Sequence, residues 1–390
     1  MQKPFFSIII PTRNRPALFR DALWSVLLQD FDDFEIVVSD NSSNDETRAV
    51  IETFPQSDHL RYFRPDSELL MPEHWEFATT KARGLYVLVL TDRSVLKRHA
   101  LKAIHQAICA EKQPVSVCSW RWSLFDDLGK VEYADIPIVR DGAVSRLVSR
   151  DVAQSFAIGE RRYPYALPRA LNSCYRNEVA DMIRSKHGVL FMHISPDFTS
   201  AFLLLAHVEH VLFMDSALFI SQGLSDSGGG RAYTTTSASE YMKSLAPRDY
   251  YAHVPIKAPL VENLVFADFL AVREMADGNL REIELGWAHY FVTCYQEVIQ
   301  KKALTAASRR EIKAIFLEWE HALAKSDFAT RQKVKRAVAG LLIVKLKIFL
   351  KRLPFWGFLL KLKFRLTVSN QNRRTVLELA GFPTQTNEGS

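Results

Sequence analysis

The stretch FEIVVSDNSSNDET, residues 34–47, runs from strand-forming residues directly into a polar segment that starts at Asp40. A similar stretch precedes it, FSIIIPTRNRP at residues 6–16, and another follows, YVLVLTDRS at residues 86–94. Short apolar runs that alternate with segments of helical periodicity predict buried parallel strands joined by helices. Ligands bind at the carboxyl ends of the strands in such sheets, so we expect the functional residues there.

Polar residues follow three of the expected strands, at residues 11–15, 40–43 and 91–94. Each segment taken alone is also explained as a helix cap, because Ser, Thr, Asp and Asn are the usual residues at helix starts. Three of them in one sheet favour a ligand site. The glycine-rich loops typical of dinucleotide and triphosphate sites are absent, so a nucleotide would be held here by side chains.

The composition is that of a globular protein, with 48% hydrophobic and 24% charged residues in a chain of 390. Its four cysteines are scattered, which argues against a disulfide scaffold and against zinc held by paired thiolates, and favours a reducing compartment. The apolar run before Pro11 is too short for a signal peptide or a membrane span. We therefore expect a cytoplasmic protein.

Two motifs, SIIIPTRNRP at residues 7–16 and FEIVVSDNSSNDET, together resemble the N-terminal half of family 2 glycosyltransferases. The resemblance implies an α/β protein of GT-A fold, a Rossmann-like mixed sheet flanked by helices, over residues 1–230. It implies an inverting transfer of sugar from a nucleotide diphosphate, with UDP expected, to a saccharide or lipid-linked saccharide in surface polysaccharide biosynthesis. The alternative is a non-catalytic nucleotide-sugar or glycan-binding protein derived from such an enzyme.

The nucleotide-binding residues are also implied by the resemblance. Asp40 would accept a hydrogen bond from the base, and a carboxylate, which offers only acceptors, selects a base edge that presents a donor. Arg13 and Arg15 are candidates for pairing with the diphosphate. The other nucleotide contacts expected on this basis are Pro11, Thr12, Asn14, Ser42, Asp92 and Arg93.

Asp92 lies where the family places its D-x-D motif, but the second acid is replaced by Ser94. Three hypotheses follow: Asp92 and Ser94 hold a weakly bound Mg²⁺ or Mn²⁺, Arg93 supplies the positive charge instead, or the site has decayed. A purely structural alternative is that Asp92 and Ser94 cap a helix expected at residues 96–109.

Asp197 lies where an inverting member of the family keeps the base that deprotonates the acceptor hydroxyl. The local pattern Ser195-Pro196-Asp197 is also a common helix start, and both roles can coexist. His193 is a less favoured base. By the same resemblance Asn172 and Arg176 face the acceptor, and residues 225–227 close the nucleotide end.

The C-terminal part is expected to hold a helical extension at residues 231–330, a basic segment at 331–366 and a polar, frayed tail at 367–390. The basic segment contains eleven of the 50 Lys and Arg residues and no acid, which leaves 39 basic against 44 acidic residues elsewhere. Nucleic acid is therefore not an expected partner. We interpret the segment as two basic amphipathic helices, for which there are two alternatives. They lie on the inner face of an anionic cytoplasmic membrane, or they pack on the protein or on a second subunit. The sequence does not predict an oligomeric state.

Overall fold

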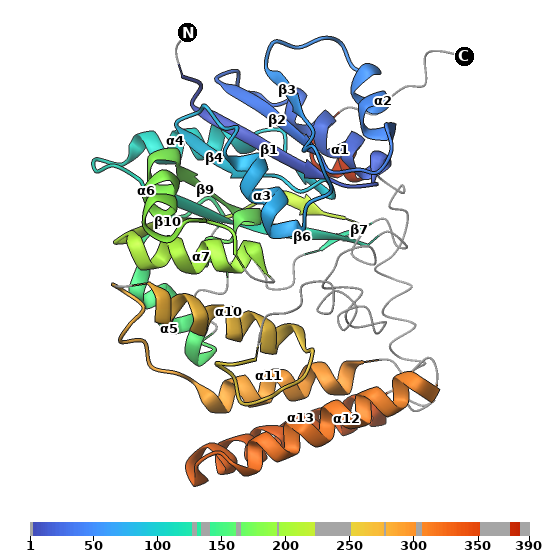
Figure 1. Ribbon diagram of the computed structural model, residues 1–390, viewed down its shortest axis with the longest axis vertical. Coiled ribbons are helices and arrows are strands. Elements are labelled where there is room, and N and C mark those ends of the chain that lie inside the picture. Colours follow the sequence, from blue (N-terminus) through green and yellow to red (C-terminus); the bar gives the residue numbers. More distant parts are fainter. Residues whose placement is uncertain are drawn as a thin grey trace.

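The computed structural model describes residues 3–126, 131–133, 141–160, 165–192, 195–222, 251–276, 278–301, 306–351 and 375–382. Ten strands of this part form one mixed sheet in the order β3-β2-β1-β4-β9-β6-β10-β5, with β7 beside β6 and β8 beside β10 (Figure 1). The strands are β1 Phe6–Thr12, β2 Phe34–Asp40, β3 Leu60–Phe63, β4 Tyr86–Val89, β5 Ser94–Leu96, β6 Val117–Asp126, β7 Val131–Tyr133, β8 Val144–Val148, β9 Ser173–Arg176 and β10 His210–Ser221.

The N-terminal half of the sheet is parallel, as the sequence predicts. β1 pairs with β2 in register from Phe6–Phe34 to Thr12–Asp40, so the loops that follow the two strands begin side by side. β4 and β3 join the same parallel group, whereas β9 runs antiparallel between β4 and β6. The predicted fold class, a mixed α/β sheet flanked by helices, is confirmed.

The strands are apolar throughout because both faces of the sheet are covered. Successive side chains of a strand point to opposite faces. Ile8 and Ile10 therefore pack in one core with helices α1 and α4, while Ile9 packs in the other with α3, α6 and α7. The helices of this region are α1 Pro16–Leu27, α2 Glu46–Glu52, α3 Met71–Thr79, α4 Ala100–Ala110, α5 Ser149–Ile158, α6 Asn177–His187 and α7 Pro196–His207.

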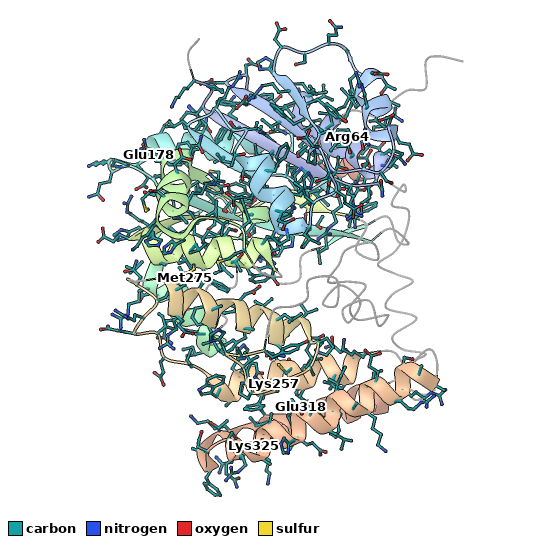
Figure 2. All side chains as sticks on the ribbon, in the orientation of Figure 1. Arg64, Glu178, Lys257, Met275, Glu318 and Lys325 are labelled. Carbon is teal, nitrogen blue, oxygen red and sulfur yellow. The ribbon has the colours of Figure 1, made fainter. Side chains whose placement is uncertain are left out.

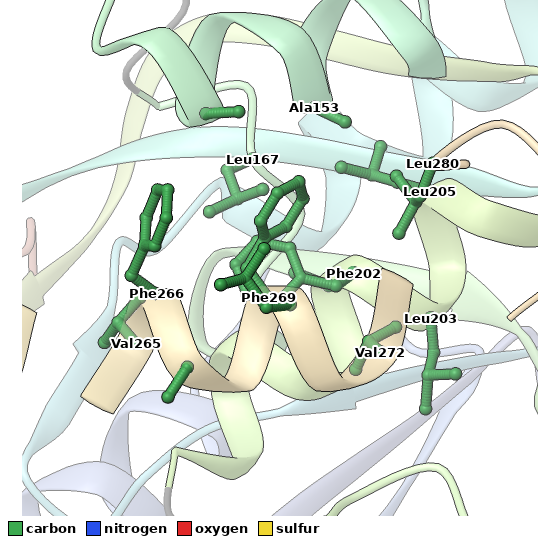
Figure 3. Close-up of a cluster of buried hydrophobic side chains, with 14 of the residues drawn as sticks. Ala153, Leu167, Phe202, Leu203, Leu205, Val265, Phe266, Phe269, Val272 and Leu280 are labelled. Atoms are coloured by element: carbon green, nitrogen blue, oxygen red, sulfur yellow. The ribbon is translucent and has the colours of Figure 1, made fainter. Parts of the chain in front are cut away.

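The C-terminal helices lie beyond α7, on the side away from the parallel strands (Figure 1). They are α10 Val261–Met275, α11 Trp287–Gln300, α12 Ala306–Ala324 and α13 Phe328–Lys351. Figure 3 shows Phe202 of α7 beside Phe269 of α10, within one continuous apolar core. Helices α10, α11 and α12 thus lie within residues 231–330, where the sequence predicts a helical extension.

The basic segment begins inside α13. Val334 is completely buried, and Val338 and Leu341 pack against the same core, so the first part of α13 is attached to the protein body. Of the two basic helices that the sequence predicts, the second lies outside the described residues. Within the described part of the chain, every helix is too short or too polar to cross a bilayer.

The predicted polar tail contains a packed element that the sequence analysis missed. Helix α15, Val376–Leu379, is capped by Thr375, whose hydroxyl accepts a hydrogen bond from the Glu378 N–H. Val376, Leu377 and Phe382 are buried against Val95 and Ile220 of the sheet. Residues 375–382 are therefore not frayed, because their few apolar side chains complete a small core beside β5 and β10.

Candidate active site

The loops after β1 and β2 are held together by Asn14. This residue adopts a left-handed backbone with φ of 53°, a conformation that asparagine tolerates better than most residues. Its N–H donates to Ser42 Oγ at 2.8 Å, and its side-chain oxygen accepts from the Ser43 N–H at 3.0 Å. Asn14 and Ser42, both predicted as nucleotide contacts, thus shape the floor of the site by binding each other.

Asp40 lies at the end of β2 and is fully buried. Its Oδ1 accepts from the Ser42 N–H at 3.0 Å, and its Oδ2 accepts from the Tyr62 hydroxyl at 2.8 Å. Burial and the Asp40 carboxylate raise the pKa of Tyr62 to about 12, so the phenol remains a donor. Each oxygen of Asp40 has a second acceptor position, which is the position that a base would use.

His74 lies behind Asp40, on α3. Its Nε2 shares a hydrogen bond of 2.9 Å with Ser39 Oγ, and its ring is buried. Burial lowers the pKa of His74 to about 4, and the ring is therefore neutral at physiological pH.

The loop after β1 contributes two other predicted nucleotide contacts. Pro11 pairs with Ser39 in the sheet, and the exposed Arg13 forms an ion pair with Glu68.

Asp92 lies in the turn between β4 and β5, next to the loop after β1. Its Oδ2 accepts from Thr12 Oγ1 at 3.2 Å, and its Oδ1 lies 3.4 Å from Arg15 Nη1. Burial raises the pKa of Asp92, and Arg15 and Thr12 lower it in part. The helix-cap alternative is wrong for both Asp92 and Ser94, because Ser94 begins β5 and α4 starts only at Ala100, after His99.

Arg93 links the Asp92 turn to the end of β10. Its Nη1 donates to Ser221 Oγ at 2.7 Å and to the Gln222 carbonyl at 3.3 Å. Its guanidinium is close enough to Asp92 and to Asp197 for both carboxylates to raise its pKa, against the lowering effect of burial. The structure therefore brings together three predicted residues that lie on two distant parts of the chain.

Asp197 occupies the first turn of α7, after Pro196 at the first helical position. The expected helix start is present, although the Ser195 side chain forms no capping hydrogen bond. Burial raises the pKa of the Asp197 carboxyl, while Arg169, the first-turn backbone N–H groups and Arg93 lower it in part. A partly desolvated carboxylate of this kind is a stronger proton acceptor than an exposed one.

Arg169 is a member of the site that the sequence analysis missed. Its Nη1 lies 3.8 Å from Asp197 Oδ2, and its guanidinium stacks over the rings of Trp122 and Phe198, at 4.5 and 5.0 Å from their centroids. The only sequence signal was the aromatic and basic character of residues 161–170, which does not single out one arginine.

The structure argues against the two predicted acceptor contacts. Asn172 is fully buried, and its amide donates to three backbone carbonyls, at 3.0 Å for Trp120, 3.1 Å for Tyr165 and 3.2 Å for Leu167. Its environment is that of a core residue.

Arg176 lies at the wrong end of the sheet. It pairs with Tyr86 at the amino end of β4, because β9 runs antiparallel, and it forms an ion pair of 2.8 Å with Glu178. Figure 2 shows Glu178 at the opposite end of the strands from Arg64. Arg64 binds the loop after β2. His193 and residues 225–227 lie outside the described residues.

Comparisons with known proteins bear on the same part of the chain. Residues 7–161 match the profile of the family described as glycosyl transferase family 2. The chain is 34% identical over 105 residues to the GalNAc(5)-diNAcBac-PP-undecaprenol β-1,3-glucosyltransferase of Campylobacter jejuni, covering 26% of this chain and 34% of that enzyme. It is 39% identical over 61 residues to the validoxylamine A glucosyltransferase of Streptomyces hygroscopicus, covering 15% and 14% of the two chains.

The matched segments thus span about a third of the first relative and about a seventh of the second. Among solved structures, S. aureus TarS 1–349 in complex with UDP-GlcNAc is similar, with a TM-score of 0.49 and 16% identity over 87% of this chain and 92% of that one. The match over residues 7–161 and the similarity to the two glucosyltransferases agree with the predicted family and enzyme class for this part of the chain.

Proposed function

Because residues 7–161 form a glycosyl transferase family 2 domain, we propose that this chain is an inverting transferase that uses a nucleoside-diphosphate sugar, with UDP as the nucleotide. The observation that carries the proposal is the placement of Asp197. This desolvated carboxylate interacts with Arg93, which in turn interacts with Asp92 at the carboxyl end of the parallel strands. The proposed base and the proposed diphosphate site would then share one charged cluster.

The reaction that fits this cluster is a single displacement. The acceptor hydroxyl loses its proton to Asp197 as its oxygen attacks the anomeric carbon of the donor sugar. The bond between that carbon and the diphosphate oxygen breaks on the opposite face, so the configuration inverts and the nucleoside diphosphate leaves. Asp197 then returns the proton to solvent. Burial raises the pKa of Asp197, which strengthens it as a base, and Arg169 and Arg93 oppose part of that rise.

Asp40 is the proposed reader of the nucleobase. It is held rigidly by Tyr62 and by the Ser42 N–H. A carboxylate in this position favours a base whose edge presents an N–H donor, as uracil and thymine do, and disfavours cytosine, which presents an acceptor there.

The proposed acceptor is a saccharide carried on a lipid, in surface polysaccharide assembly. Support comes from the C. jejuni relative, whose name describes a glucosyltransferase for an undecaprenol-linked saccharide. The basic segment 331–366 would then hold the enzyme at the anionic inner face of the cytoplasmic membrane, where each basic residue contributes about 1 kcal/mol.

Replacing Lys345, Lys347 and Lys351 by Gln tests this membrane contact. The replacement should reduce binding to phosphatidylglycerol vesicles but not the weaker binding to phosphatidylcholine vesicles. Unchanged binding to both would refute membrane contact through these residues.

The decisive test of the function is Asp197→Asn. We expect sugar transfer from UDP-sugars to fall by about 10²–10⁴-fold, the usual contribution of a general base, while UDP affinity stays within about threefold. Glu178→Gln is the control for the loss of a carboxylate, because Glu178 is paired with Arg176 outside the site and is 67% exposed. Full turnover by Asp197→Asn would exclude Asp197 as the base. A wild-type protein that binds UDP-sugars without transferring or hydrolysing them would support the non-catalytic alternative.

A further inference from the structure

The side chains at the D-x-D position do not suit a divalent metal ion. Mg²⁺ and Mn²⁺ prefer several oxygen ligands, carboxylates above all. Ser94 Oγ is committed to Thr91 Oγ1 at 2.8 Å, and Asp92 already contacts Thr12 and Arg15. The described residues contain no group of three or more His, Cys, Asp and Glu side chains that would complete a metal site. The carboxylate of Asp92 has the Arg15 guanidinium 3.4 Å away, and this positive charge opposes the binding of a cation.

Positive charge is supplied here by arginines. Arg15, Arg93 and Arg169 interact electrostatically with Asp92 and Asp197, so the cluster has three cationic and two anionic groups. Such an excess of positive charge in a partly desolvated position favours an anionic ligand.

Arg93 is the best placed of the three. Both of its hydrogen bonds, to Ser221 and to the Gln222 carbonyl, use Nη1. Its Nε and Nη2 therefore carry three N–H groups for which the described part of the chain shows no partner. An arginine anchored through one nitrogen presents its other edge in a fixed orientation, which matches two oxygens of a phosphate.

We infer that Arg93, assisted by Arg15, binds the diphosphate of the donor in place of a divalent metal ion, and that Asp92 positions Arg15 instead of ligating metal. The inference rests on the proposed function and specifies how its donor site works. The two guanidinium groups neutralise the charge that develops on the departing diphosphate as the anomeric bond breaks. Thr12 and the buried position of Asp92 keep this carboxylate fixed beside Arg15.

The test is calorimetric binding of UDP to the full-length protein, in EDTA and in Mn²⁺ or Mg²⁺. We expect the dissociation constants under the three conditions to agree within about threefold. Arg93→Met should weaken UDP binding by about 30-fold, because the lost hydrogen bonds to a charged phosphate are worth about 2 kcal/mol. Arg93→Lys should recover part of this loss, and UMP, which lacks the β-phosphate, should be less affected.

Arg48→Met is the control for the change of charge, since Arg48 lies on α2 and is 66% exposed. Circular dichroism establishes that each variant is folded. UDP binding that requires metal, or Arg93→Met that binds UDP like the wild type, would overturn the inference and leave the proposed transferase intact. Failure of the wild type to bind UDP or TDP with or without metal would overturn the inference and the proposed function together.

Discussion

Two partly buried ion pairs of nearly equal exposure, Glu76 with Arg184 and Asp197 with Arg169, differ in how completely they are paired. Glu76 and Arg184 are 18% and 15% exposed, and Asp197 and Arg169 are both close to these values at 18% and 19%. Glu76 binds Arg184 through Oε1 and accepts the N–H groups of Leu190 and Phe191 through Oε2, at 2.9 and 3.0 Å. Asp197 and Arg169 are separated by 3.8 Å.

The difference separates a structural pair from a functional one. Every oxygen of Glu76 is satisfied, and Arg184 also donates to Thr79. Within the described part of the chain, the Asp197 carboxylate interacts only with the N–H groups of its own helix turn and with arginines, of which Arg169 is 3.8 Å away, and burial raises its pKa. Buried charge that is fully paired stabilises a local arrangement, whereas buried charge that is incompletely paired retains capacity for a ligand or a proton.

The largest effect that we predict from this comparison is on folding. Glu76→Gln leaves Arg184 with only the exposed carboxylate of Asp181, 3.6 Å from its Nη1, and should lower the free energy of unfolding by about 3–5 kcal/mol in a denaturant titration. Asp197→Asn removes a desolvated charge and should change stability by less than about 1 kcal/mol, or raise it. Equal losses in the two variants would show that the pairs are equivalent.

The second prediction concerns His74, a neutral buried group that is satisfied by Ser39. Its pKa is about 4 in the folded state and about 6.5 when unfolded, so the unfolded chain binds more protons between these values. The His74 contribution to stability is therefore complete above pH 6.5 and is lost as the pH falls towards 4, by about 3 kcal/mol. His74→Gln, which keeps a hydrogen-bonding group beside Ser39, should flatten the pH dependence of unfolding in this range. An unchanged dependence of unfolding on pH in His74→Gln would contradict this role of His74.

The sequence predicted the parallel half of the fold because the information there is local. Strand runs such as residues 6–12 and 34–40 are apolar, and their ends meet because parallel neighbours share an edge. Asp40 and Asp92 could be selected for the same reason, with help from the family resemblance, whereas Asp197, in the first turn of α7, was selected from the resemblance.

The errors arose where distant segments decide the structure. The structural alternative for Ser94, a helix cap, is wrong because Ser94 pairs with Ser221 of β10, far along the chain. Arg176 was placed near the acceptor, but the antiparallel direction of β9 carries it to the amino ends of the strands. Arg169 was not selected, because its contacts with Trp122 and Asp197 have no local sequence pattern.

A third prediction sharpens the functional half of the comparison. Arg169 lowers the pKa of Asp197, so Arg169→Met, which keeps an apolar chain against Trp122, should raise that pKa. Because Asp197 acts as a base in its ionised form, the acid limb of the kcat/KM profile should move to higher pH. Activity on that limb should fall about tenfold. Arg169→Lys keeps the charge and should restore most of the shift, and an unmoved limb would exclude this electrostatic role.

The smallest effect is expected at Asp40, which is intermediate between the two pairs because each of its oxygens accepts one bond and can accept another. Asp40→Asn introduces an N–H₂ donor where the wild type offers only acceptors, so the preference for UDP over CDP should fall about fivefold in competition binding. Tyr62→Phe is the control: it removes one donor to Asp40 and should cost about 1 kcal/mol of stability without altering the base preference. If Asp40→Asn discriminates between the two nucleotides as the wild type does, then Asp40 belongs with Glu76, as a carboxylate whose capacity is consumed within the fold.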